Sequence, residues 1–353
     1  MKFKSLRQIL KVFALSSATT LLTGCDNVIM DYEGDCSVHY KVAFTYTQNM
    51  EGADAFASQL SSVTLYVVDK SGRIVTSKTE SGESIKTPGY KMDVDVAPGT
   101  YDLLVWGQRE AAMDDATAFS IAAGSTPTTL TQLTATLPLQ GSEGDFYSDR
   151  DIKPLFHGLI SDVEFPDTYG DVTVGSVDLM KDTNVFQVLI QSIDGSEIPD
   201  NEFSFYITAD NSELSYDNSV ISTESFQYRP WKVTETSASF DGSENNNESD
   251  SRAGETVNGL LGELTTGRLI TDRRQTLVVH RNSDDTDVIR INLIDYLLMV
   301  KGEYNRLLTN QQYLDRMGYY TLMFFLDADR NWFTAGGVYI NGWRIVPDES
   351  VII

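Results

Sequence analysis

A cysteine near the start of the chain has the sequence context of a residue that becomes covalently modified. It closes the run Leu21-Leu22-Thr23-Gly24-Cys25, in which apolar and small residues lead up to a thiol. Small residues leave the preceding peptide bond open to a signal peptidase, and the thiol can then carry acyl chains. This pattern predicts cleavage before Cys25 and attachment of lipid to its sulfur.

The residues before this cysteine support the same prediction. Basic residues lie in the first eleven positions, and an apolar run follows them. That run is shorter than the roughly 20 apolar residues that a transmembrane helix requires. We therefore interpret residues 1–24 as a lipoprotein signal peptide, and the acidic residues 25–35 as a spacer that serves as an export address to the outer leaflet. The alternative is a plain secretory signal followed by an ordinary buried thiol.

The other residue types that could do chemistry form no recognised catalytic or metal-binding pattern. The three histidines, His39, His157 and His280, have no Cys or His partner at ligand spacing. Asp93 and Asp95 are two residues apart in a strand pattern, and a solvated strand face explains them better than a metal site. We therefore expect no enzyme activity, no cofactor and no metal site, although a pair of glycosidase carboxylates would be invisible in sequence.

Charge and cysteine content exclude further classes of function. The net charge is −24 at pH 7 over 353 residues, and removal of the basic signal peptide takes it to −28. Phosphate backbones bind clustered Lys and Arg, so nucleic acid is not an expected partner. Only two cysteines occur, and lipidation of Cys25 leaves Cys36 without a disulfide partner. We expect Cys36 to be a small buried residue and the fold to depend on large cores.

The first half of the chain consists of strand patterns separated by turn residues. Alternating apolar residues predict strands at residues 38–46, 63–68, 90–96, 101–107, 128–139 and 155–158. The turns at residues 69–72 and 97–100 each predict a hairpin between their flanking strands. A short helix is expected within residues 53–60. Together these elements predict an N-terminal β-sandwich domain over residues 36–160.

The second half repeats this organisation after a turn-rich boundary at residues 161–170. Strands are predicted at residues 172–174, 177–180, 185–190, 203–207, 276–280, 287–293, 319–327 and 338–346, with one short helix within residues 304–316. Residues 239–255 lack apolar periodicity, and their acidic spacing does not match a calcium loop, so we expect an exposed loop. The spacing predicts a second antiparallel β-sandwich over residues 161–353.

A set of short motifs along the mature chain resembles those of the FimB-type fimbrial anchor proteins of Bacteroidales. The matching segments are residues 36–46, 65–69, 99–107, 155–158, 228–230, 267–269, 312–316 and 340–346. The resemblance implies an all-β fold of two transthyretin-like antiparallel β-sandwich domains with one or two short helices. It also implies a basal subunit that the lipid on Cys25 holds in the outer membrane, where it attaches a surface fimbria and limits its length.

The resemblance also implies fimbrial stalk or accessory subunits as partners. Such fibres are held by strand addition, in which an extended segment of one subunit enters an open groove of the next. Residues 347–353 are expected to be too short to donate a strand, so this subunit would end the fibre. The long acidic insertion at residues 239–255 departs from the family pattern.

The alternative function is that of a surface lipoprotein that binds a glycan or a host protein. Lectin surfaces need exposed aromatic rings. Trp231 and Trp332 follow polar residues and are expected to be exposed, whereas Trp106 and Trp343 lie in strand patterns and are expected to be buried. The exposure of these rings would help to separate the two functions.

Overall fold

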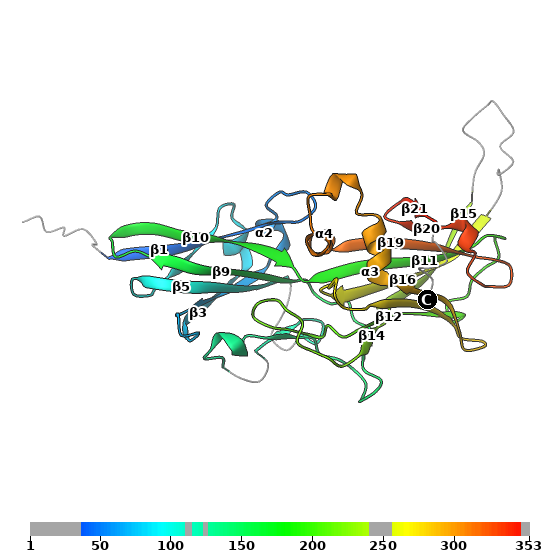
Figure 1. The fold of residues 1–353 in the computed structure, drawn as a ribbon, viewed down its shortest axis with the longest axis horizontal. Coiled ribbons are helices and arrows are strands. Elements are labelled where there is room, and N and C mark those ends of the chain that lie inside the picture. The colour runs from blue at the N-terminus through cyan, green and yellow to red at the C-terminus, as the bar shows by residue number, and fades with distance from the viewer. Residues whose placement is uncertain (1–36, 110–114, 123–125, 240–255, 347–353) are drawn as a thin grey trace, which may run out of the picture.

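Strands with alternating buried and exposed residues dominate the structure, which confirms the predicted all-β class. The computed structural model describes residues 37–109, 115–122, 126–239 and 256–346. Figure 1 shows an elongated molecule with one sheet at one end and further sheets at the other. Cys25, Cys36 and nearly all of the predicted loop at residues 239–255 lie outside the described residues.

The first sheet has seven strands and curls around its own core. Their order is β3 (Ile74–Ser81), β2 (Ser62–Val68), β5 (Gly99–Gln108), β9 (Leu155–Phe165), β10 (Gly170–Lys181), β1 (Val38–Gln48) and β4 (Lys91–Val94). Inward residues such as Tyr40 and Val42 of β1 share this core with Leu65 and Val67 of β2. Full burial stabilises the fold by about 1.5–3 kcal/mol for each large apolar side chain.

One predicted hairpin is confirmed and the other is wrong. β2 and β3 form the hairpin at residues 69–72, where the Asp69 amide donates to the Arg73 carbonyl over 2.9 Å. The strands on either side of residues 97–100 do not pair. Instead β4 pairs with β1, while β5 lies between β2 and β9. Val94 and the inward residues of β5 are buried in the same core, so the connection between the two strands crosses from one layer of the curled sheet to the other.

The predicted boundary at residues 161–170 falls inside the first sheet. β9 continues to Phe165 and pairs with β5, and β10 begins at Gly170 beside β1. Buried Phe165 follows half-buried Val163 at the strand period, and this short alternation is masked in the sequence by the surrounding turn residues. The chain leaves the first sheet at Asp182, the single residue between β10 and β11 (Thr183–Ser192).

Two facing sheets form the other end of the molecule. The six-stranded sheet has the order β15 (Lys232–Ser239), β16 (Thr256–Gly267), β11, β19 (Tyr319–Leu326), β20 (Val338–Ile340) and β21 (Trp343–Ile345). The five-stranded sheet has the order β18 (Thr286–Asn292), β17 (Thr276–Arg281), β12 (Phe203–Ala209), β14 (Phe226–Tyr228) and β8 (Tyr147–Ser148). Residues such as Phe186 of β11 and Phe205 of β12 share the core between these sheets.

A segment predicted in the first domain packs on the second. The predicted strand at residues 128–139 is a 3-10 turn (Leu130–Gln132) followed by the two-residue strand β7 (Ala135–Thr136). β7 lies between β6 (Ser120–Ile121) and β13 (Glu213–Leu214) in a small third sheet. Leu133 and Leu137 are buried in the second core. Their spacing reflects contact with that core and not a long strand.

The described residues contain three short α-helices, where one or two were predicted. α2 (Phe56–Gln59) lies in the predicted range, whereas α3 (Leu293–Met299) was not predicted and begins at the last residue of the predicted strand at residues 287–293. α4 (Asn310–Met317) starts later than predicted, because Thr309 and Gln312 form a capping box there. None of the helices among these residues is long and apolar enough to cross a membrane.

The segment predicted as the last strand, residues 338–346, forms a hairpin of two short strands. β20 and β21 pair across Asn341 and Gly342, whose φ angles of 49° and 83° are those of an Asn-Gly turn. β21 is therefore the outer strand of the sheet, and Trp343 is 68% exposed. The predicted burial of Trp343 is wrong because the turn places this ring at the sheet edge.

The connection between the two ends of the molecule contains a buried carboxylate. Asp182 is fully buried, accepts a hydrogen bond from Asn218 Nδ2 over 2.7 Å, and leaves Oδ2 without a partner in the described structure. Burial raises its pKa to about 7, against the opposing effect of the nearby Arg268 guanidinium. Asp315 also acts on this carboxylate and favours its protonated form.

Replacement of Asp182 by Asn is expected to stabilise the protein at pH 8. The folded state holds a proton that the unfolded state releases, so the stability from this group is greatest near pH 4 and is lost as the pH rises to about 7. At about 1.4 kcal/mol per pKa unit, the difference reaches up to roughly 4 kcal/mol.

Urea unfolding of both proteins between pH 4 and pH 8 measures this difference. Burial lowers the pKa of His157 to about 4, so this residue makes the protein more stable as the pH rises. The effect is the same in wild type and variant and cancels in their difference. A constant difference between wild type and variant across this range would contradict the expectation.

Candidate functional site

The first sheet leaves its two outermost strands facing each other. β3 and β4 stand at opposite ends of the strand order, yet the curl of the sheet brings them together. Lys78 of β3 donates from Nζ to the Asp93 carbonyl of β4 over 3.0 Å. No described strand pairs with the outer edge of either one. The sheet is therefore nearly closed, with an open seam between β3 and β4.

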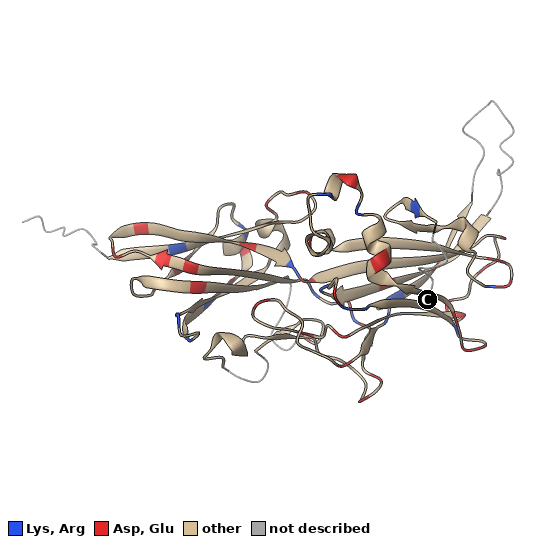
Figure 2. Cartoon of the chain, viewed as in Figure 1, with Lys and Arg blue, Asp and Glu red and all other residues tan. Residues whose placement is uncertain are grey.

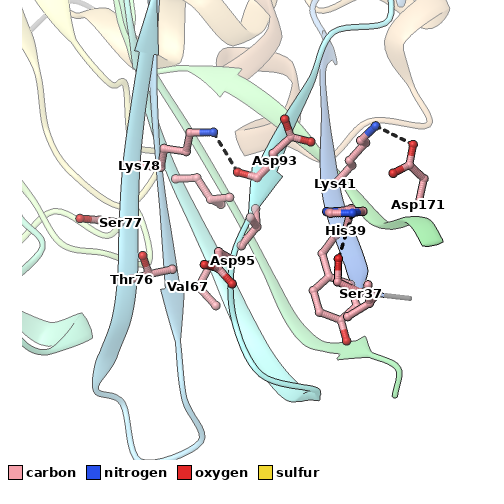
Figure 3. Close-up of a pocket in the computed structure, with 14 residues that line it drawn as sticks. Ser37, His39, Lys41, Val67, Thr76, Ser77, Lys78, Asp93, Asp95 and Asp171 are labelled. Carbon is pink, nitrogen blue, oxygen red and sulfur yellow. Dashed lines mark hydrogen bonds and ion pairs between the residues drawn. The ribbon is translucent and has the colours of Figure 1, made fainter. Parts of the chain in front are cut away.

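A groove of about 860 Å³ lies along this seam. Consecutive residues of each wall line it, among them Thr76, Ser77 and Lys78 of β3 and Asp93 and Val94 of β4. Neighbouring residues of a strand point to opposite faces, so a hollow lined by consecutive residues runs along a strand edge. Figure 3 shows Thr76 and Asp95 on the two sides of this hollow. We call this hollow the seam groove.

The floor of the seam groove is apolar and its rim is charged. Leu65 and Val67 of β2 form part of the floor and are almost fully buried. On the rim, Lys41 bonds to Asp171 over 2.9 Å, and this hydrogen bond raises the pKa of Lys41. An apolar floor between two open backbone edges suits an extended peptide.

Lys78 makes one of the contacts between the two edges of the seam. Besides Asp93, its ammonium group contacts Glu80 over 2.8 Å, and its side chain is 44% exposed. Ion pairs at such exposure stabilise a fold by about 0–1 kcal/mol. An entering strand could therefore displace Lys78 at small cost.

The structure separates the histidines and acidic residues that the sequence singled out. His39 lies at the seam groove with Nε2 3.1 Å from Ser37 Oγ, His157 is buried against Trp106, and His280 contacts Asp287 over 2.8 Å. Across the described ranges, no three His, Cys, Asp or Glu residues lie close enough together to hold a metal ion. Figure 2 shows acidic residues along the length of the described part of the molecule.

The exposure of the four tryptophan rings agrees only in part with the sequence prediction. Trp106 is buried with 2% exposure, as predicted, and Trp231 is 38% exposed, as predicted. Trp332 packs edge-on against Phe324 with 5.8 Å between ring centroids, so its predicted exposure is only partial. The most exposed ring is that of Trp343, which was predicted to be buried.

Sequence patterns did not reveal the seam groove. The sequence of β3 is polar and lacks the apolar alternation that predicts a strand. The pairing of β4 with β1 depends on contacts between distant parts of the chain, which no local pattern shows. The one usable signal was the hairpin turn at residues 69–72, which requires a strand after it. Cys25, the predicted lipid attachment site, lies outside the described residues.

Comparison with known families gives one match over nearly the whole chain. The model of the family described as fimbrillin-A associated anchor proteins Mfa1 and Mfa2 matches residues 32–349. A search of curated proteins gave no match.

Several solved structures are similar over most of the chain. A candidate adhesin from Bacteroides thetaiotaomicron has a TM-score of 0.74 and 28% identity, covering 90% of this chain and 100% of that one. A candidate polysaccharide-binding protein from the same species has a TM-score of 0.71 and 29% identity, covering 89% and 100%. The fimbrial anchor protein Mfa2 of Porphyromonas gingivalis, at 16% identity, shares the fold with a TM-score of 0.62 over 89% and 100%.

Proposed function

Because this chain belongs to the family of fimbrillin-A associated anchor proteins Mfa1 and Mfa2, we propose that it is the lipid-anchored basal subunit of a surface fimbria. Acyl chains on Cys25 hold it in the outer membrane, and the folded residues receive the fimbria. Its partners are fimbrial stalk or accessory subunits. Family membership makes it a fimbria-associated structural protein, and the lipid anchor comes from the sequence around Cys25.

The seam groove is the feature of the structure that best supports this proposal, and we assign it as the binding site for the fimbria. Neither of its two edge strands has a further strand partner among the described residues, and both lie above an apolar floor. A donated strand would pair with the backbone of these edges and place alternate side chains on Leu65 and Val67. Each backbone hydrogen bond contributes about 0.5–1.5 kcal/mol, so several of them outweigh the loss of the Lys78 contacts.

A basal position also explains how the fibre would stop. A subunit that is fixed in the membrane by lipid and receives a strand in its seam groove occupies the end of the fibre. Growth beyond it is blocked by the membrane. We include the limitation of fibre length in the proposed function on this ground.

Replacement of Thr76 by Arg is expected to reduce the number of attached fimbriae at least tenfold. Thr76 is half-buried on the wall of the seam groove, and a long charged side chain there would occupy the space of the donated strand. Electron microscopy counts the fimbriae per cell, and membrane fractionation checks that the variant protein is present.

The matched control is Val75→Arg on the same strand. Val75 is 46% exposed and does not line the groove, so this variant should assemble normally. The unfolding midpoints of both variants should stay within a few degrees of wild type, because both lie on an edge strand. Normal attachment by the folded Thr76→Arg protein would argue against strand capture at the seam.

Glycan binding is a second candidate function. It is favoured by the exposed rings of Trp231 and Trp343 and by the similarity to a candidate polysaccharide-binding protein. However, Trp231 adjoins β15 and Trp343 lies on β21, at opposite edges of the six-stranded sheet. These rings do not form one platform, and we therefore rank this function second.

A further inference from the structure

A second open groove lies at the other end of the molecule, between the two facing sheets. Its volume is about 520 Å³, and its walls come from β12 and from the segment that leads into β15. Four consecutive residues of β12, Phe203, Ser204, Phe205 and Tyr206, line it. As at the seam, a hollow lined by consecutive residues runs along a strand edge. We call it the β12 groove.

The β12 groove exists because β14 is too short to cover its neighbour. β14 pairs with β12 only at residues 207–209. Pro230 follows two residues after β14, and Trp231 then donates its amide to Glu263 in the other sheet. The chain therefore crosses between sheets at this point, and among the described strands the first half of β12 pairs with β17 alone. At about 3.3 Å per residue, this open edge is roughly 13 Å long.

The direction of the unpaired backbone groups follows from one hydrogen bond. The Glu202 carbonyl accepts from the Asn282 amide over 3.0 Å, so the backbone groups of Glu202 face the β17 side. Backbone direction alternates along an antiparallel strand, and Ile207 faces β14. The N–H and C=O groups of Phe203 and Phe205 therefore face the β12 groove. They form a template for two residues of an added strand.

The side chains around the groove restrict the chemistry of its occupant. Phe203 and Phe205 are buried beneath it, and Val233, at 39% exposure, lies on the opposite wall. At one end, Asp200 lines the groove and its amide donates to Glu235 over 3.0 Å. Neither of these carboxylates forms an ion pair with any described residue. The groove therefore has an apolar middle and a carboxylate end, and the one cation among the described residues that line it, Arg229, pairs with Asp145 over 2.8 Å.

We propose that the β12 groove binds an extended peptide segment of an accessory fimbrial subunit as an added strand beside β12. The segment has apolar side chains at alternate positions, which contact Phe203, Phe205 and Val233. A basic side chain at one end reaches Asp200 and Glu235. This inference rests on the proposed fimbrial function, and it gives the subunit a second contact that is separate from the seam groove.

Hydrogen exchange of the full-length protein, alone and in isolated fimbriae, tests the proposal. In the fimbriae, the amides of Phe203 and Phe205 should exchange at least tenfold more slowly than in the free protein. Val233→Arg places a charge on the groove wall and should abolish this protection. The control variant Tyr169→Arg, at a position 78% exposed in the connection between β9 and β10, should leave it unchanged.

The outcomes separate this inference from the proposed function. Protection at residues 76–78 of the seam without protection at Phe203 and Phe205 overturns the β12 inference and leaves strand capture at the seam intact. Protection at Phe203 and Phe205 alone supports the inference and contradicts capture at the seam. If purified cell-surface polysaccharide protects the same two amides in the free protein, the occupant is a glycan and the inference is overturned.

Discussion

Replacement of Cys25 by Ser is expected to release fimbriae from the cell into the medium. A serine hydroxyl cannot take the place of the thiol that carries lipid, so the variant would lack its acyl chains. Each buried methylene contributes about 0.8 kcal/mol to membrane binding, and two or three chains make the attachment effectively permanent. Without them, the subunit and the fibre bound to it have no hold on the outer membrane. Immunoblots of fimbrial subunits in the medium and in the cell pellet measure the shift.

The second cysteine provides the matched control for this experiment. Cys36→Ser changes the same side chain eleven residues later, outside the signal, and should leave the fimbriae on the cells. Electron microscopy of the released material should show fibres of normal structure, because the folded residues are unchanged. If the Cys25→Ser protein stays in the membrane fraction with its fimbriae, the anchor is not the lipid and the proposed function fails at that point.

Replacement of Arg268 by Met is expected to destabilise the protein by about 3–5 kcal/mol. The Arg268 guanidinium donates from Nε and Nη2 to the two carboxylate oxygens of Asp315, each over 2.9 Å. The two side chains are only 14% and 9% exposed. Removal of the cation leaves Asp315 and the neighbouring Asp182 as buried carboxylates without a positive partner. Chemical denaturation at pH 7 measures the change in the free energy of unfolding.

Two further variants show whether the loss comes from the unpaired charge. Arg268→Met combined with Asp315→Leu removes both charges and should recover more than half of the lost stability, since apolar replacement of a buried pair is nearly neutral. Arg306→Ala breaks an exposed pair with Glu303, whose atoms are 2.7 Å apart, and should cost less than about 1 kcal/mol. A cost for Arg268→Met no larger than for Arg306→Ala would contradict the expectation.

The pattern of apolar residues predicted most strands that have regular alternation, but it missed the central strand β16 and the polar edge strands β3 and β15. β1, β2, β11 and β19 have buried residues at every second position, and the sequence shows that alternation directly. β3 and β15 are mostly exposed, polar segments without apolar alternation; the turn at residues 69–72 implied a strand after β2, and nothing in the sequence indicated β15. Polar edges protect a sheet against unwanted pairing. The same property hides them from a search for apolar alternation.

Both candidate sites are bounded by such polar edge strands. The seam groove is bounded by β3, and the β12 groove opens towards the segment that leads into β15. Both grooves also need a strand that stops early or pairs with a distant partner, as β14 and β4 do. Such pairings depend on the packing of segments far apart in the chain, and no local pattern encodes them.

The sequence by itself predicts the lipid anchor on Cys25, and it determined the all-β class and the absence of a recognised catalytic motif. These depend on local chemistry: a signal peptidase reads a few adjacent residues, and a half-buried strand needs only alternation along its own length. Only the tertiary structure decided that β9 and β10 extend the first sheet to Asp182, and that the sheet closes until Lys78 meets Asp93. The open edges that can receive a strand arise from that closure, because an edge is defined by the neighbour that a strand lacks.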